Sequence, residues 1–414
     1  MALLTLLQES KVFGDFYVPR FEIRVSGAGL PATVLRDVIK VTYSDDIKKL
    51  DNFELTVNNW DATTREFKYV GAETLASLGI RSDPTQKQKI NPLHRIFEPT
   101  SNKVEVFLGY GGTLKLMLSG IFTTIEPNFP SSSASTLTVR GLNVLHALRT
   151  KQRTQVFPEK KESEIAKSFE RLLPDPDNVG QKLKILINPP APPNAEAPIP
   201  YVAQDNQYDI DFLFERARQA GYELFIQEQE KKGAKVIKER GLYFGPSDSA
   251  HASLGSDVLE LKWGISLIDF KPTLTTANQI GTVVLNGWNV LTKKKIVGRA
   301  SIKDIKLNRD LHGLLKNPDA REEHVVDEPV FNQAQADRRA KAILLGRMKD
   351  LVKASGTCIG LPGLRAGQRV RIGELGARFS GEYFVTSTTH TLDDSGYITK
   401  FNARREEKQE GAEQ

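Results

Sequence analysis

Histidine, cysteine and acidic side chains are the groups most able to catalyse a reaction or hold a metal ion, and their spacing in this chain favours neither role. The chain of 414 residues carries six histidines and one cysteine. No two histidines have the HExxH spacing, which places two zinc ligands on one face of a helix. His324 and Glu328 lie four residues apart, but the second histidine of such a site is missing. We therefore interpret His324 as a solvated loop side chain, and we predict no catalytic, metal-binding or cofactor-binding residues.

Cys358 and His390 are side chains whose local sequence favours burial. Cys358 lies in the segment 356–360 without a histidine nearby, and a thiol becomes a nucleophile only where a base or a cation lowers its pKa. His390 lies in the alternating run 383–391, which is typical of a strand. We predict an inert buried thiol and a packed strand histidine. A single cysteine also excludes a cysteine-rich zinc module.

The segment Gly27–Ala32 superficially fits the glycine pattern of dinucleotide-binding loops. That pattern binds pyrophosphate only where it opens a helix. Here Pro31 is followed by Val34, Val38 and Val41, whose spacing we interpret as the approach to a strand. We therefore predict a β-turn at this segment. The P-loop and the GxSxG nucleophile elbow are also absent from the sequence.

The densest basic cluster consists of Lys293, Lys294, Lys295 and Arg299. The net charge of +6 results from 57 Lys+Arg against 51 Asp+Glu. A nucleic-acid interface would need aromatic residues among the cations or a recognisable module, so we predict no specific nucleic-acid binding. Two interpretations stay open for the cluster: a solvated strand end, or a docking surface for an acidic partner.

Alternating apolar residues predict short strands over the first part of the chain. Phe21, Ile23 and Val25 form one such run, and similar runs recur as far as about residue 141, separated by glycine-containing turns. Many short strands with one apolar face are typical of a β-barrel or a sandwich. We predict a first domain of this kind over about residues 15–150.

The spacing of apolar residues then changes to that of helices. Residues 165–173 have apolar side chains on one helical face, and a second helix is predicted over Tyr208–Ala220, ending at Gly221. Six prolines in the segment 189–200 predict an extended surface loop. Together these features predict a mixed α/β insertion over about residues 155–252.

Short strands return in the last part of the chain. A long helix is predicted over residues 332–353, with Ala336 and Ala340 facing inward. We predict a second β-rich domain over about residues 255–405, followed by a charged tail at 406–414. No apolar run approaches the roughly 20 residues needed to cross a bilayer, and Met1–Gln8 lacks the pattern of a signal peptide. We therefore expect a protein that is made in the cytoplasm and does not insert into a membrane.

Three segments, in the expected order, resemble phage late control D proteins and VgrG proteins. They are residues 208–225, an acidic helix that ends at a Gly-Tyr pair; residues 360–397, strands divided by glycine turns; and residues 104–130, a strand, a Gly-Tyr turn and a Glu-Pro run. The resemblance covers about residues 15–405. The structural motif residues that it implies are Phe212, Leu213, Gly221, Tyr222, Gly381, Tyr383, His390 and Tyr397.

The resemblance implies a structural protein without enzymatic activity, the baseplate hub of a contractile phage tail or injection system. The implied fold is β-rich α+β, with two tail-tube-like β-barrel domains and a mixed α/β insertion. Three copies would form a ring of six similar units, which could join a six-fold inner tube to a three-fold spike. The implied partners are two further copies, a spike protein, inner tube proteins and baseplate wedge proteins, all within an assembled particle. VgrG proteins continue into a spike, whereas this sequence continues only into a charged tail, so a separate spike chain is implied.

Two other functions stay open. The first is a secreted β-rich binding or adhesion module, which would have no fixed three-fold state. The second is a cell-wall-degrading, tail-associated enzyme. That enzyme would need two acidic residues in a lysozyme-like helical context, and the sequence does not indicate such a pair.

Overall fold

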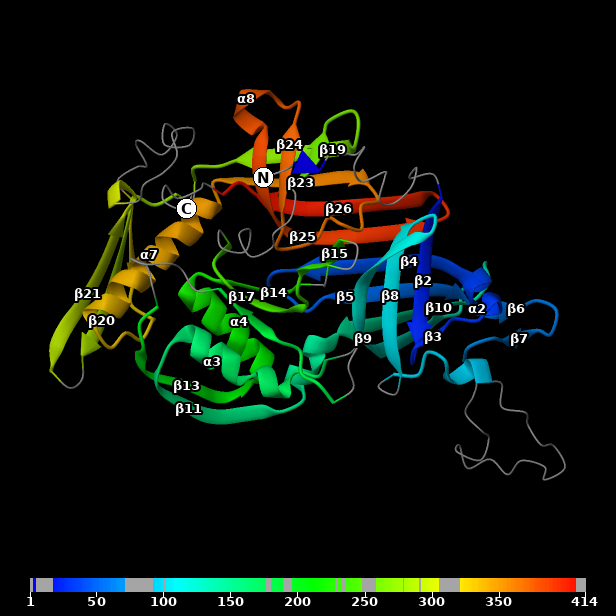
Figure 1. The fold of residues 1–414 in the computed structure, drawn as a ribbon, viewed down its shortest axis with the longest axis horizontal. Coiled ribbons are helices and arrows are strands. Elements are labelled where there is room, and N and C mark those ends of the chain that lie inside the picture. The colour runs from blue at the N-terminus through cyan, green and yellow to red at the C-terminus, as the bar shows by residue number, and fades with distance from the viewer. Residues whose placement is uncertain are drawn as a thin grey trace.

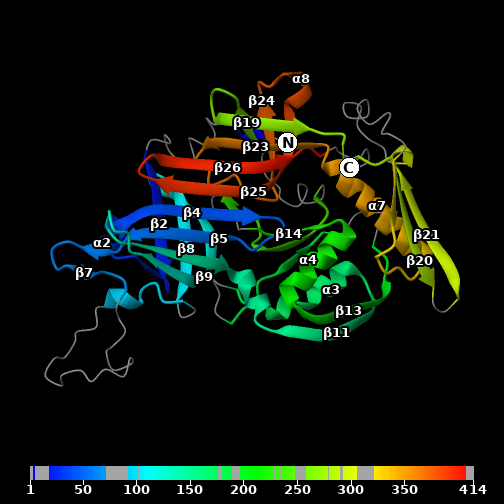
Figure 2. The same cartoon turned by 180° about the vertical axis from the view of Figure 1, so that it is seen from behind.

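The computed structural model is rich in strands and poor in helices, which confirms the predicted β-rich α+β class. In Figure 1 and Figure 2 the early strands lie at one end of an elongated molecule, the green elements lie in the middle, and a yellow hairpin with a long helix lies at the other end. The described residues are 3–4, 18–70, 92–99, 102–175, 180–188, 196–227, 230–232, 235–247, 258–277, 279–289, 292–304 and 321–406.

Alternation of apolar and polar residues builds the first group of strands, as predicted. In β5 the side chains of Phe53, Leu55 and Val57 are buried, while Glu54 on the opposite face is half-exposed. The strands of this group are β2 (Pro19–Val25), β3 (Ala28–Gly29), β4 (Val38–Asp46), β5 (Asn52–Asn58), β8 (Lys103–Tyr110), β9 (Thr113–Asn128) and β10 (Thr136–Asn143). A small hairpin, β6 (Trp60–Asp61) with β7 (Glu66–Phe67), and the 3-10 turn η1 (Pro92–Arg95) accompany them.

A short helix follows the first turn, and this corrects the prediction that the chain leads straight from the turn into a strand. The turn is present, with Gly27 at a φ of 83°. α2 (Ala32–Asp37) then begins after Pro31 and buries Val34. The fixed φ of proline is compatible with the start of a helix, and the helix ends after six residues, where β4 begins.

The middle group packs two helices against small sheets. Its 3-10 turns are η2 (Val144–Arg149) and η3 (Glu170–Leu172), its helices are α3 (Glu162–Ser168) and α4 (Asp209–Ala220), and its strands are β11 (Gln152–Lys160), β12 (Ile185–Ile187), β13 (Ile199–Tyr208), β14 (Glu223–Gln227), β15 (Glu230–Lys232), β16 (Lys235–Lys238) and β17 (Gly241–Gly245). β13 pairs with β11, so the last two residues of the predicted 189–200 loop, Ile199 and Pro200, begin a strand instead. Residues 189–195 lie outside the described residues.

The last group combines strands with the longest helix. It consists of β18 (Val258–Lys262), β19 (Leu267–Leu274), β20 (Thr282–Asn289), β21 (Lys294–Ser301), η4 (Ile302–Asp304), β22 (Glu322–Val325), α7 (Gln333–Lys349), β23 (Val352–Ile359), β24 (Arg369–Gly373), α8 (Gly376–Phe379), β25 (Gly381–Asp393) and β26 (Gly396–Arg404). The Asn332 side chain caps α7 by accepting from the Gln335 amide at 2.8 Å. The helix ends before residue 353, because Val352 already belongs to β23, a strand that the sequence did not reveal.

One 14-stranded sheet unites the first and last groups. The connection is the antiparallel pairing of β25 with β4, in which His390 lies opposite Tyr43. We call this pairing the seam. β1 (Leu3–Leu4) adds a parallel pair at β18. Strands of the two predicted β-rich regions are thus joined edge to edge. Three large apolar clusters form the core, one for each group of elements.

Candidate functional site

A loop of residues 360–368, here called the seam loop, lies against strands of both β groups. The Tyr110 hydroxyl on β8 donates to the Gly360 carbonyl at 2.9 Å. The Leu361 amide donates to Thr399 Oγ1 on β26 at 3.0 Å. The loop belongs to the segment that resembles the late control D and VgrG proteins. Its contacts therefore tie that segment to both halves of the large sheet.

His390 is completely buried beside the seam loop, which confirms the prediction of a packed strand histidine. Burial lowers its pKa to about 4, so the ring is neutral at pH 7. Its Nε2 lies 3.0 Å from the Leu364 carbonyl; because a carbonyl can only accept, Nε2 carries the proton. Nδ1 is then the acceptor for the hydroxyls of Tyr397 and Thr399, at 2.9 and 3.0 Å.

Arg365 and Asp45 form a buried ion pair that links the seam loop to β4. The Arg365 Nε lies 2.7 Å from Asp45 Oδ2, and its Nη2 donates to the Met117 carbonyl at 3.0 Å. The guanidinium also lies over the Tyr43 ring, 4.7 Å from its centre. The other Asp45 oxygen accepts from the amide and the hydroxyl of Thr388. Both oxygens of this carboxylate therefore have hydrogen-bond partners at the seam.

Asp51, between β4 and β5, is a buried carboxyl that no cation of the described residues contacts directly. Burial, together with the nearby charge of Asp45, raises its pKa to about 8, so it is largely protonated at pH 7. Its Oδ2 accepts from the Asn143 amide side chain at 2.9 Å. No pattern in the sequence indicated this buried carboxyl, which forms a structural hydrogen bond with Asn143.

The remaining motif residues of the family resemblance are core or turn positions. Tyr383 is buried and its hydroxyl donates to the Phe379 carbonyl at 2.8 Å, and Gly381 has a φ of 140°. Phe212 and Leu213 of α4 are also buried, as is Tyr397. Their shared role as a family signature stays a prediction.

Gly221 ends α4 and lets α7 approach. It has a φ of 75°, a left-handed conformation that favours glycine. A Cβ at this position would lie 3.3 Å from the Ala342 Cβ on α7. The helix end and the contact between the two helices therefore impose the same choice of residue.

We expect Gly221→Ala to lower the free energy of unfolding by about 1–2 kcal/mol, the cost of placing an alanine in the left-handed region. Gly346→Ala on α7 is the matched control, because nothing lies within 4 Å of its Cβ and alanine favours the helix. Urea unfolding followed by circular dichroism would measure both variants. Equal stability of the two would contradict this account of Gly221.

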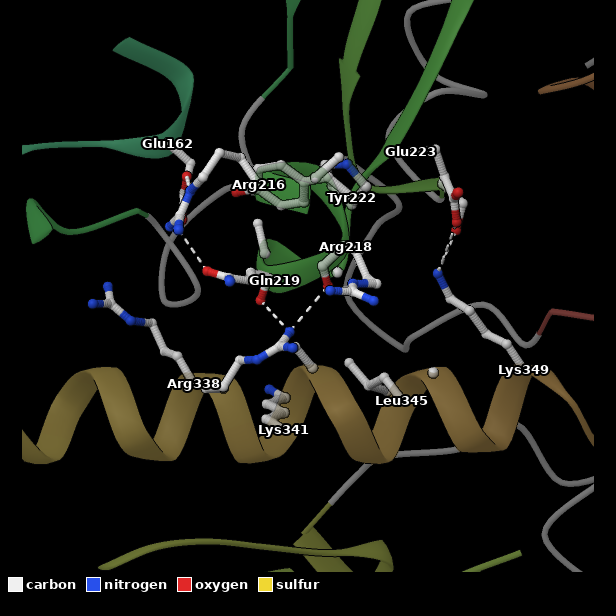
Figure 3. A pocket seen from close by; sticks show the side chains of 18 of the residues that line it. Glu162, Arg216, Arg218, Gln219, Tyr222, Glu223, Arg338, Lys341, Leu345 and Lys349 are labelled. Atoms are coloured by element: carbon white, nitrogen blue, oxygen red, sulfur yellow. Dashed lines mark hydrogen bonds and ion pairs between the residues drawn. The ribbon is translucent and has the colours of Figure 1, made fainter. Parts of the chain in front are cut away.

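A pocket of about 1000 Å³ lies between the end of α4 and the face of α7 (Figure 3). Arg339 of α7 donates to the carbonyls of Arg218 and Gln219 at 3.0 and 2.6 Å, which belong to the last turn of α4. The Arg218 carbonyl also accepts from the Gly221 amide at 3.3 Å. Arg339 also pairs with Glu328, and Arg216 pairs with Glu162. Guanidinium groups therefore hold two of the carboxylates that line the pocket.

The far end of the pocket holds a buried cluster of four charged residues, here called the C-terminal clasp (Glu223, Lys349, Arg404 and Glu406). Lys349 lies 3.7 Å from both glutamates, and Figure 3 shows its approach to Glu223. Arg404 pairs with both as well, and Glu406 accepts from Ser247 Oγ at 2.6 Å. This corrects the predicted tail at 406–414: Glu406 is buried, and residues 407–414 lie outside the described residues.

The predicted basic cluster lies at one end of the β20–β21 hairpin. Lys293, Lys294 and Lys295 are exposed where β21 begins, and Arg299 is exposed further along the strand. Arg299 lies 3.8 Å from the Glu322 carboxylate. The structure therefore gathers the three lysines and leaves Arg299 beside an acid.

Other candidate groups are structural or isolated. Cys358 is buried, as predicted, and burial raises the pKa of its thiol. His324 is exposed on β22, rather than in a loop, 3.3 Å from Glu322. Within the described ranges, no three His, Cys, Asp or Glu side chains gather to hold a metal ion. None of the helices in the described part of the chain is long and apolar enough to cross a membrane.

Comparison with protein families identifies the greater part of the chain. Residues 85–394 match the family described as the Alg8 N-terminal domain. The chain belongs to this family. Membership alone assigns it no activity. No curated protein sequence matches the chain.

Solved structures share this fold over nearly the whole chain. A 43 kDa tail protein of prophage MuSo2 from Shewanella oneidensis is 13% identical with a TM-score of 0.59, covering 94% of this chain and 98% of that chain. A tail protein from Neisseria meningitidis is 12% identical with a TM-score of 0.61, covering 94% and 97%. A type VI secretion system component of E. coli, described as similar to the T4 tail proteins gp27 and gp5, is 12% identical with a TM-score of 0.54, covering 92% and 76%. At sequence identities this low, the structural likeness shows a common fold and nothing more.

The sequence analysis missed the ion pair of Asp45 with Arg365 and the C-terminal clasp. The pattern of β4 nevertheless contained an indication of the ion pair. Val41, Tyr43 and Asp45 all point to the buried face of the strand. An acid that continues an apolar inward-facing row needs a buried partner. The pattern of β4 therefore indicated that Asp45 needs a buried partner, but it could not identify Arg365 as that partner.

Proposed function

We propose that the chain is the baseplate hub of a contractile tail or injection system, a structural protein of the late control D and VgrG type. The observation that carries the proposal is the likeness to two tail proteins, one of them from a prophage, over almost the full length of each chain. A likeness of this extent concerns the whole architecture and not one common module.

The edge-to-edge pairing at the seam supports the ring arrangement. Within one chain, β4 and β25 already join two β groups side by side. A ring of three chains would repeat such lateral contacts and cover further strand edges. We propose that residues 15–150 and 255–405 are tail-tube-like barrels, that 155–252 is the insertion, and that three chains present six similar units.

The partners follow from this arrangement. A six-fold inner tube would meet the six units on one side, and a separate spike protein would meet the three-fold side. Wedge proteins would contact the periphery. The hub would work inside an assembled particle, without enzymatic activity and without insertion into a membrane.

The experiment that tests the hub is the mass of the purified chain by light scattering, alone and with the candidate spike protein. We expect a mass near three chains in at least one of these conditions. A monomer in both would contradict the hub and favour a binding or adhesion module. Clearing of bacterial cell walls in a zymogram would instead favour the tail-associated enzyme.

A charge at an exposed strand edge should break the ring. Among the described strands, β19 pairs only with β23, and its Ile268 is 58% exposed. We expect Ile268→Asp to convert trimers to folded monomers, because a carboxylate buried at a chain–chain contact is costly. Val156→Asp, on the two-stranded β11–β13 ribbon, is the control and should stay trimeric. Trimers of unchanged mass with Ile268→Asp would contradict edge pairing through β19.

A further inference from the structure

The β20–β21 hairpin has one covered and one uncovered face at its far end. Alternate residues of a strand point to opposite faces. A Cβ at Gly298 would contact the backbone of Ala336 on α7, so this face of β21 lies directly against the helix. Lys295, Val297 and Arg299 therefore point away from α7. In Figure 1 and Figure 2 the hairpin lies at one end of the molecule, with α7 along one side of it.

An indole lies among the cations of the uncovered face. Trp288 is directly opposite Lys295 in the antiparallel pair, and its side chain is 58% exposed. Val297 is also exposed, at 38%. We call Trp288, Lys295, Val297 and Arg299 the hairpin face. It combines an exposed aromatic ring, an aliphatic side chain and positive charge, which is the composition of a protein–protein contact.

The lysine of the hairpin face has no acidic partner. Among the residues that the structure describes, Lys295 forms no ion pair. Arg299 is paired loosely, because its closest approach to the Glu322 carboxylate is a long 3.8 Å. An anionic partner would therefore meet cations that are available at little cost in broken interactions.

The edge of β21 is closed to an added strand. Gln333 of α7 donates its side-chain amide to the Val297 carbonyl at 2.7 Å, and Asp337 accepts from the Arg299 amide at 3.2 Å. These backbone groups are the ones that an incoming strand would need. A partner must therefore lie across the face and contact its side chains.

We infer that the hairpin face is a docking surface for an acidic protein segment of a neighbouring tail component, an inference that rests on the proposed hub function. The segment would carry acidic residues on either side of an apolar one. Lys295 and Arg299 would receive the acids, about 13 Å apart along the strand, and Trp288 with Val297 would receive the apolar side chain. A second copy of this chain fits poorly, because the chain itself carries a net charge of +6.

A nucleic acid also fits less well than a protein segment. The carboxylates of Glu322 and Asp337 lie beside Arg299, where they would repel a continuous row of phosphates. A protein segment can place its charges only where the cations are. The test below includes DNA so that the two classes of partner are separated.

The experiment uses the full chain and a short dye-labelled peptide that alternates aspartate with valine and contains one phenylalanine. Fluorescence anisotropy should detect binding that weakens with added salt. The same peptide with asparagine for aspartate should bind at least about tenfold more weakly. Trp288→Ala, and separately Lys295→Glu/Arg299→Glu, should each lower the affinity at least about tenfold, as expected for an aromatic anchor and its charged neighbours.

The β11–β13 ribbon provides matched control variants. It carries an exposed aromatic residue, Tyr201, at 49%, and Lys151 and Lys160 are exposed beside and at the end of β11. Tyr201→Ala and Lys151→Glu/Lys160→Glu should leave peptide binding unchanged. Light scattering should give the same mass for all variants, so a loss of docking is distinguished from a failure of the hub itself.

Three results would overturn the inference. One is equal binding of the acidic and the neutral peptide. Another is an equal loss of affinity in the ribbon controls. The third is tighter binding of a single-stranded DNA of the same net charge, which would assign the hairpin face to nucleic acid.

Discussion

Replacing Arg365 with methionine is expected to lower the free energy of unfolding by about 3–5 kcal/mol, the usual cost of leaving a buried charge without its partner. Asp45 is 5% exposed and pairs with Arg365 at 2.7 Å. Methionine has a similar length but no charge. The carboxylate would then remain in the seam with only hydroxyl and amide donors.

Two further variants separate the ion pair from simple loss of packing. Arg365→Met combined with Asp45→Asn removes both charges and should recover part of the loss, because no uncompensated charge stays buried. Arg36→Met, at an exposed arginine of α2, should change stability by less than about 0.5 kcal/mol. Urea unfolding midpoints would measure all three. An Arg365→Met protein as stable as Arg36→Met would show that the seam does not depend on this pair.

Glu406→Gln in the C-terminal clasp is expected to have a similarly large effect, about 3 kcal/mol at neutral pH. Burial opposes the charge of Glu406, but the cations Lys349, Arg404 and Arg369 outweigh it and lower its pKa to about 2 from an ordinary 4.5. Glutamine keeps the shape of the side chain and removes the charge that these cations attract. Two of the three other clasp residues, the cations Lys349 and Arg404, would then lose part of their compensating negative charge.

The pH dependence of this difference has a definite sign. The pKa of Glu406 is lower in the folded state, so its stabilisation is complete above about pH 4.5 and is lost as the pH falls toward 2. The gap in unfolding free energy between the wild type and Glu406→Gln should therefore shrink over that window. Taking the difference cancels the titration of His390 and Asp51, which both proteins share. A gap that stays constant from pH 7 to pH 3 would contradict the assignment.

Local patterns were sufficient to predict many elements of the fold. The alternation in β5 and the glycine that ends α4 need only neighbouring residues, and both are where the sequence indicated. β23 was missed because it follows α7 after only two residues and consists mainly of small residues, which do not mark a buried face strongly. β11 was missed because polar side chains occupy most of its outward positions.

The seam and the clasp could not be predicted because their members are distant in the sequence. Asp45 and Arg365 are 320 residues apart, and Ser247 and Glu406 are 159 apart. A charged residue reveals that it needs a partner only when its burial is known, and the burial of Glu406 depends on α7, β14 and β26 together. The basic cluster was visible in the sequence, but the exposed Trp288 opposite Lys295 emerged only from the pairing of β20 with β21.

The pairing of β25 with β4 also has a mechanical consequence. Its register runs from Ser387 opposite Asp46 to Asp393 opposite Lys40, and in an antiparallel ladder the hydrogen bonds lie perpendicular to the strands. A force directed along the strands would load all of these bonds in shear at once, whereas a force across them would open the ladder one bond at a time. The two β groups are thus joined stiffly against sliding and weakly against peeling. A force along the strand direction would therefore pass from one β group to the other through the whole ladder. The ion pair of Arg365 with Asp45 adds a further link between the seam loop and β4.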